Sequence, residues 1–189
     1  MANEKLNILK LLIENQGTLF SIRKISQLRK INYKSAYLAV KKLEKEGIVA
    51  LLRTGNTINC SFNKKFNSSV FEVESERRVD LIKNPNLKLI YNDLKRINLP
   101  FIAVLFGSYV KGMQTKHSDI DLLVVAEDAR PILQVLSLRP FKIHVTDVTY
   151  KDFISMLKSK EFTAVSEAVQ KNIILNGIDE YYRLIENAG

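Results

Sequence analysis

Residues 107–125 read GSYVKGMQTKHSDIDLLVV, and this stretch carries the strongest fold signal in the chain. Apolar runs of strand length stand on either side of the turn, over residues 101–106 and 120–126. The pair Gly107-Ser108 follows the first run directly and marks a turn into a short helix. The stretch therefore predicts a strand, a turn with one short helix, and a second strand.

The polar residues of this stretch suit phosphate and metal chemistry. A Gly-Ser turn after a strand exposes backbone N–H groups and a hydroxyl, which can surround phosphate oxygens, and Lys111 adds positive charge nearby. Asp119 and Asp121 are two residues apart on a strand, so their side chains project from the same face. Paired carboxylates are hard oxygen ligands for Mg²⁺ or Mn²⁺. Together these groups indicate phosphoryl chemistry on a nucleoside triphosphate (NTP).

This segment resembles the minimal nucleotidyltransferase family of the DNA polymerase β superfamily, whose signature is Gly-Ser, ten residues, then Asp-x-Asp. The resemblance covers about residues 86–150. It implies NTP binding by Gly107 and Ser108, with ATP the expected substrate, and divalent metal held by the catalytic Asp119 and Asp121. It also implies transfer of a nucleoside monophosphate to an acceptor hydroxyl, with release of pyrophosphate.

The family requires a third carboxylate on a later strand, and here the chain departs from the pattern. The corresponding strand, residues 141–149, reads FKIHVTDVT. If Ile143 and Val145 pack in the core, His144 faces the metals and Asp147 points away. We therefore expect His144 in the third catalytic position. Asp147 could serve only if a bulge shifts the register, and His144 as a simple packing residue is the alternative.

Positive charge is concentrated in the first third of the chain. Residues 1–66 contain 13 Lys+Arg and 4 Asp+Glu, so they account for the whole formal net charge of +9. Such asymmetry predicts a polyanionic partner for this segment and a different task for the rest.

Residues 4–63 resemble a winged helix-turn-helix domain. Helical spacing predicts helices over residues 4–14 and 33–45, with a short helix capped by Ser21 between them, and two strands form a hairpin over residues 48–62. The resemblance implies that the helix over 33–45 enters the major groove of duplex DNA. The expected DNA-contacting residues are Tyr33, Lys34, Ser35, Tyr37, Lys41 and Lys45, with Arg53 at the wing tip.

The complete expectation is an α+β chain with three parts. A winged helix-turn-helix domain over residues 1–66 is followed by a helical linker over 67–85 and a nucleotidyltransferase domain over 86–189, whose mixed sheet is flanked by helices. Helices are expected over residues 163–175 and 178–185, separated by Gly177.

Several classes of protein are excluded. No apolar run approaches the ~20 residues that span a bilayer, and the N-terminus lacks a signal-peptide pattern, so we expect a cytoplasmic protein without a membrane partner. The single cysteine, Cys60, excludes an internal disulfide and argues against structural zinc.

The sequence leaves open the acceptor of the nucleotide, the oligomeric state and the choice between an enzyme and two other functions. The resemblance implies an acceptor that is a small molecule or a protein hydroxyl, for example on a toxin partner. A homodimer is compatible with the chain. Leu38 shares a face of its helix with lysines, and an apolar residue on such a face hints at an apolar contact. Alternatively, the protein is a transcriptional regulator whose degenerate transferase domain only binds nucleotide. A third possibility is a scaffold in which both domains contact only other proteins.

Overall fold

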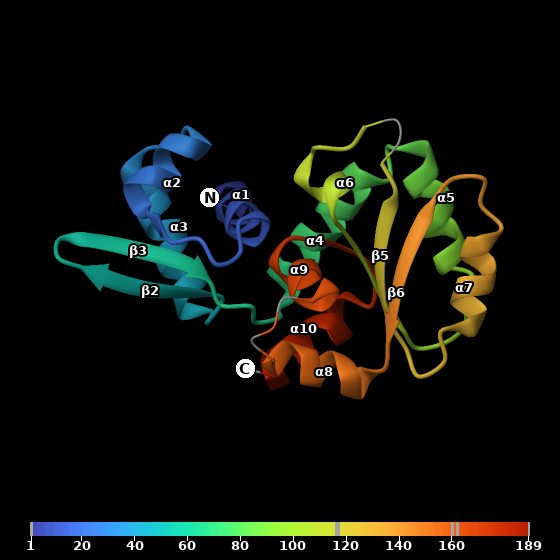
Figure 1. Ribbon diagram of the computed structural model, residues 1–189. Coiled ribbons are helices and arrows are strands. Elements are labelled where there is room, and N and C mark those ends of the chain that lie inside the picture. Colours follow the sequence, from blue (N-terminus) through green and yellow to red (C-terminus); the bar gives the residue numbers. More distant parts are fainter. Residues whose placement is uncertain (1, 116–117, 160, 162, 189) are drawn as a thin grey trace. The chain divides into compact units, whose positions relative to one another are not determined.

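The computed structural model describes residues 2–115, 118–159, 161 and 163–188 (Figure 1). The chain forms two compact units, Met1–Val73 and Glu74–Gly189. The division falls inside helix α4 (Ser68–Leu81), within the segment expected to be a helical linker. Across the described residues, every helix is too short or too polar to cross a lipid bilayer.

The first unit begins with three helices that bury their apolar faces. Ser21 caps α2 by accepting a hydrogen bond from the backbone N–H of Lys24, and Asn32 caps α3 in the same way through Ser35. The buried face of α3 consists of Ala36, Ala39, Val40 and Leu43. The helices are α1 (Ala2–Glu14), α2 (Ile22–Arg29) and α3 (Tyr33–Lys45).

A three-stranded antiparallel sheet completes this unit, in the order β1-β3-β2. Its strands are β1 (Phe20–Ser21), β2 (Val49–Thr54) and β3 (Thr57–Phe62). The two-residue β1 is absent from the sequence expectation, because two residues carry no periodicity. Cys60 on β3 is buried and donates a hydrogen bond to the Phe20 carbonyl at 3.1 Å; burial raises the pKa of its thiol to about 12.

The second unit contains a four-stranded mixed sheet in the order β6-β5-β4-β7, flanked by helices (Figure 1). Strand β4 is antiparallel to both neighbours, and β5 is parallel to β6. Its strands are β4 (Ile102–Phe106), β5 (Ile120–Val125), β6 (Ile143–Val148) and β7 (Ile173–Asn176). Its further helices are α5 (Pro85–Leu94), α6 (Ser108–Lys111), α7 (Arg130–Ser137), α8 (Tyr150–Lys158), α9 (Ala164–Gln170) and α10 (Ile178–Ala188).

Helices cover both faces of this sheet. One face of β5 carries Ile120, Leu122 and Val124, which pack with buried residues of α5 and α7. Helices α9 and α10 lie on the opposite side, where α9 contacts β4 and β5 (Figure 1). Because strand side chains alternate, Asp119 and Asp121 project toward this opposite side.

The helix expected over residues 163–175 is a wrong prediction. Helix α9 ends at Gln170, and residues Ile173–Asn176 form the edge strand β7, paired with β4. A short apolar run fits a buried helix or a strand equally well by periodicity. Residues 173–176 form a strand because β4, which lies some seventy residues earlier in the chain, has a free edge with which they can pair.

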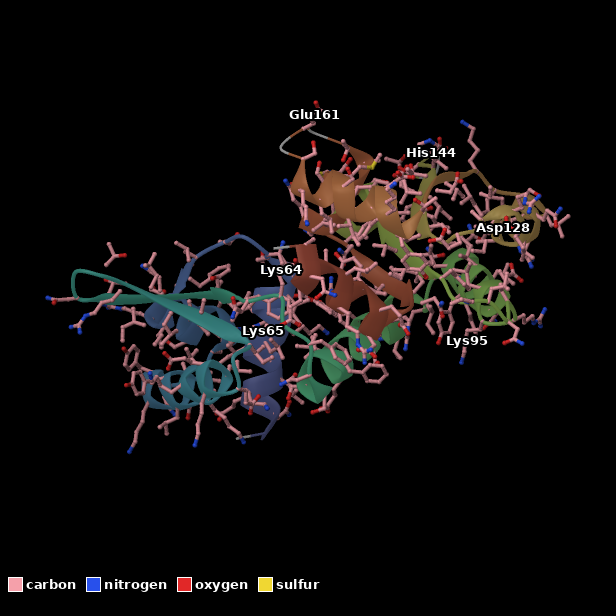
Figure 2. All side chains as sticks on the ribbon, turned by 90° about the horizontal axis from the view of Figure 1, so that it is seen from below. Lys64, Lys65, Lys95, Asp128, His144 and Glu161 are labelled. Atoms are coloured by element: carbon pink, nitrogen blue, oxygen red, sulfur yellow. The ribbon has the colours of Figure 1, made fainter. Side chains whose placement is uncertain are left out.

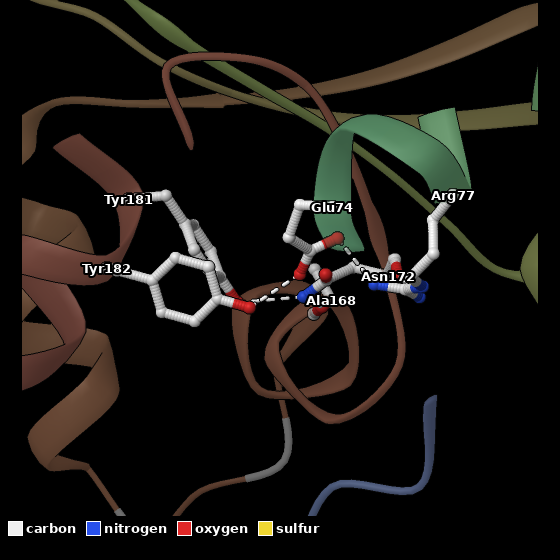
Figure 3. A network of polar contacts seen from close by, with 6 residues as sticks. All are labelled: Glu74, Arg77, Ala168, Asn172, Tyr181 and Tyr182. Carbon is white, nitrogen blue, oxygen red and sulfur yellow. Dashed lines mark hydrogen bonds and ion pairs between the residues drawn. The ribbon is translucent and has the colours of Figure 1, made fainter. Parts of the chain in front are cut away.

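A buried polar network joins α4, the start of β7 and α10 (Figure 3). The guanidinium of Arg77 donates to Oε2 of Glu74 at 2.6 Å and to the carbonyl of Asn172 at 2.5 Å. The hydroxyl of Tyr182 donates to Oε1 of Glu74 at 2.5 Å, and the Asn172 amide donates to the hydroxyl of Tyr181 at 2.7 Å. Glu74 is completely buried, so both of its oxygens depend on these donors.

Candidate functional site

The turn between β4 and α6 packs directly against an acidic side chain. Gly107 has φ 72° and ψ −148°, a backbone conformation that residues with a side chain rarely adopt. A Cβ atom built there would lie 2.1 Å from Oδ2 of Asp121. Both the backbone angle and the close approach therefore require glycine.

Two carboxylates stand at the start of β5 beside this turn. The side chains of Asp119 and Asp121 are 42% and 27% exposed, so a ligand can reach both. Partial burial raises the pKa of Asp121; the nearby imidazole of His144 opposes this rise, while the negative charges of Glu167 and Asp119 add to it. These mutual effects place four ionisable groups within electrostatic reach of one another.

Strand register places His144, and not Asp147, next to Asp121. In the parallel β5–β6 ladder Asp121 pairs with His144 and Val124 pairs with Asp147, without a shift of register. The Nδ1 atom of His144 lies 3.6 Å from Oδ1 of Asp121, and the imidazole is largely exposed (Figure 2). Asp147 projects from the other face of the strand. The role of His144 in catalysis stays a prediction.

Two described lysines near the site, Lys111 and Lys142, are both paired with acids. Nζ of Lys111 lies 2.7 Å from Oε1 of Glu167, and Nζ of Lys142 lies 3.6 Å from Oδ1 of Asp119. A pocket of about 440 Å³ opens at Asp119. Its lining residues are Asn86, Tyr109, Ser118, Asp119, Ile120, Pro140, Phe141 and Lys142.

Glu167 is the site residue that sequence reasoning missed. It lies on α9, within the segment expected to be a longer helix, and nothing local distinguishes it from other surface glutamates. Only the packing of α9 against the sheet brings it to Lys111 and Asp121. Lys116 and His117, inside the Gly-Ser to Asp-x-Asp spacing, lie outside the described residues.

The residues expected to contact DNA are in the first unit, and most of them are exposed. Tyr33 and Tyr37 stack on the surface of α3 with ring centroids 6.4 Å apart, next to exposed Lys34 and Leu38. The expected lysines Lys34, Lys41 and Lys45 are not all unpaired, since Lys41 forms an ion pair with Glu44. Lys45 is exposed, Ser35 is half-buried in the first turn, and Arg53 at the hairpin tip donates to the Gly55 carbonyl at 3.3 Å.

The carboxylates of the site suit a divalent cation that binds together with substrate. Among the residues that the structure describes, no three His, Cys, Asp or Glu side chains gather closely enough to hold a metal ion by themselves. Mg²⁺, however, is commonly bound by one or two carboxylates together with substrate phosphates. Asp119 and Asp121 supply that smaller number, so they fit an ion that arrives with a triphosphate.

Comparison with protein families gives a match for the second unit. Residues 87–176 match the family described as nucleotidyltransferase domain, a range that runs from α5 to β7 and includes the Gly107 turn and both aspartates. The match supports the nucleotidyltransferase family for this part of the chain, and with it a transferase that moves a nucleoside monophosphate. Searches of curated proteins and of solved structures found no match.

Proposed function

We propose that the second unit is a metal-dependent nucleotidyltransferase that moves a nucleoside monophosphate from an NTP, ATP being the expected one, to an acceptor hydroxyl. One observation carries the proposal: the Gly107 turn packs against Asp121, so the phosphate-binding turn and the carboxylates form one site. The family match over residues 87–176 supports the same chemistry.

Each residue has a role in this proposal. The backbone of Gly107 and the backbone and hydroxyl of Ser108 bind phosphate oxygens, and Lys111 adds a positive charge. Asp119 and Asp121 hold Mg²⁺ or Mn²⁺ together with the triphosphate. A metal held by these two carboxylates would supply positive charge to offset the charge that develops on the transferred phosphoryl group. His144 contacts Asp121 and occupies the third position, where a neutral imidazole suits Mn²⁺ better than Mg²⁺.

Replacing Asp119 and Asp121 together by asparagine is expected to abolish transfer, because the metal loses both of its carboxylate ligands. The measurement is incorporation of labelled nucleotide from ATP into components of a cell lysate, with Mg²⁺ and with Mn²⁺. The matched control is Asp147→Asn, which removes an exposed carboxylate from the opposite face of β6 and is expected to leave transfer unchanged.

Two outcomes of this assay count against the proposal. Transfer that persists in the double variant would place the reaction elsewhere. Tight ATP binding without transfer to any component would favour the alternative, in which the transferase domain of a transcriptional regulator only senses nucleotide. A labelled acceptor would be identified by its mass, which separates a small molecule from a protein such as a toxin partner.

The first unit, we propose, is a winged helix-turn-helix domain that binds duplex DNA through α3. Three features support this: the helix–strand order, the exposed Tyr33–Tyr37 pair, and a net positive charge confined to residues 1–66. Lysines on a helix that lies in the major groove neutralise phosphates, and the released counterions supply much of the affinity.

Reversing three charges on α3, with Lys34→Glu, Lys41→Glu and Lys45→Glu combined, is expected to weaken binding of duplex DNA by at least tenfold. The slope of log affinity against log salt should also fall by about three, since each lysine accounts for one phosphate contact. Fluorescence anisotropy over a salt series measures both quantities. The control reverses three exposed lysines of the second unit, Lys88, Lys151 and Lys158. Equal losses in the two variants would contradict a specific role for α3.

A further inference from the structure

An ion pair between distant segments occupies the lysine next to the phosphate-binding turn. Nζ of Lys111, in the last turn of α6, lies 2.7 Å from Oε1 of Glu167 on α9. The side chains are 38% and 30% exposed, so water and solutes reach the pair. The Glu167 carboxylate thus sits where Lys111 would otherwise offer its ammonium to an anion.

Helix α9 is fixed without help from this pair. Thr163 and Ser166 form a capping box at its start, and Val165, Ala168 and Val169 are buried. After its end, the amide of Asn172 donates to the Ala168 carbonyl at 2.6 Å. Glu167 therefore projects from a rigid helix.

Lys111 is the last residue of a much shorter helix. Helix α6 has only four residues; Tyr109 and Val110 pack half-buried against the core, whereas Lys111 itself is exposed and is followed by Gly112. The lysine side chain has four rotatable bonds and a strongly hydrated ammonium, so it can change partners at low cost. Between the two partners, Lys111 is the one that can move.

We propose that Glu167 competes with the triphosphate for Lys111, its carboxylate taking the place of a phosphate group until the nucleotide binds. The inference rests on the proposed function, because it assumes that Lys111 is a phosphate ligand. A carboxylate and a phosphate offer an ammonium the same kind of charged oxygen acceptor. Glu167 consequently lowers the affinity of the site for NTP and sets the concentration at which it fills.

A double-mutant cycle tests the competition. The affinities of inorganic tripolyphosphate and of ATP, each with Mg²⁺, are measured by calorimetry on the full chain and on Glu167→Gln, Lys111→Gln and the double variant. Glu167→Gln is expected to bind both ligands about three- to tenfold more tightly, and Lys111→Gln about three- to tenfold more weakly. In the double variant the gain from Glu167→Gln should vanish, because no ammonium is left to release.

The control for overall charge is Asp128→Asn, which removes one negative charge beyond the far end of β5 and should change neither affinity. An equal gain from Glu167→Gln with and without Lys111 would overturn the competition and indicate simple charge repulsion. Unchanged affinity in Lys111→Gln would overturn it as well, while transfer that depends on the aspartates would still uphold the proposed function. Absence of tripolyphosphate and ATP binding by the unmodified protein would overturn both.

Discussion

Gly107→Ala is expected to abolish nucleotide binding and to lower the free energy of unfolding of the second unit. The native backbone angles, φ 72° and ψ −148°, lie in a region that is nearly confined to glycine, and they cost a residue with a Cβ about 1–3 kcal/mol. The new Cβ would also lie 2.1 Å from Oδ2 of Asp121, a distance that forces the carboxylate to move. Because Asp121 is both a neighbour of the turn and a proposed metal ligand, one methyl group disturbs the phosphate-binding and metal-binding parts together. ATP titration with Mg²⁺ and chemical unfolding measure the two effects.

The matched control for this substitution is Gly112→Ala. Gly112 also has a positive φ, 71°, but its ψ of 23° places it in the left-handed helical region, and a Cβ there would meet nothing within 4 Å. It therefore carries a left-handed backbone cost of about 1–2 kcal/mol without the collision, and we expect it to lose stability while retaining ATP binding. If both variants lost binding equally, backbone strain in α6 would explain the result, and the proposed contact with Asp121 would not.

Glu74→Ala is expected to cost about 3–5 kcal/mol, the range for removing one partner of a buried ion pair. The guanidinium of Arg77, 5% exposed, would lose its carboxylate partner, and the Tyr182 hydroxyl would lose its acceptor. Replacing Glu74 by alanine also leaves a cavity beside these groups. For a unit of this size, Glu74–Gly189, the loss corresponds to a fall in Tm of roughly 12–20 °C.

Thermal unfolding followed by circular dichroism measures this loss. The control is Glu72→Ala on the same helix, where the side chain is exposed and the change should stay within about 0.5 kcal/mol. A similar Tm for the two variants would mean that the network of Figure 3 contributes little to stability. A lower Tm in Tyr182→Phe alone would locate the contribution at its hydrogen bond to Glu74.

The local parts of the site could be predicted from the sequence. The pattern from Gly107 to Asp121 connects two adjacent strands, β4 and β5. The spacing of two residues alone indicates that the side chains of Asp119 and Asp121 share a face. The alternation of apolar and polar residues in β6 likewise favours His144 over Asp147 beside the aspartates, and the register places His144 there.

What the sequence did not predict depends on contacts between distant segments. Strand β7 forms because an edge of β4 is available, and two-residue β1 forms because β3 offers it a partner. Glu167 lies 56 positions after Lys111, so no local pattern connects them. The sequence places Lys34, Lys41 and Lys45 on one face of α3. It does not show that Lys41 pairs with Glu44, because this pairing depends on the rotamers that the two side chains adopt.

The central place of β4 has a consequence for biosynthesis. This strand, which leads into the Gly107 turn, is hydrogen-bonded on one side to β5 (Ile120–Val125) and on the other to β7 (Ile173–Asn176). A nascent chain that has emerged only as far as residue 170 can complete the first of these pairings but not the second. Strand β4, which precedes the Gly107 turn, is therefore paired on both sides only late in translation. A ribosome-bound fragment ending at residue 170 would contain every residue of the Gly-Ser to Asp-x-Asp motif but not the complete sheet that supports it.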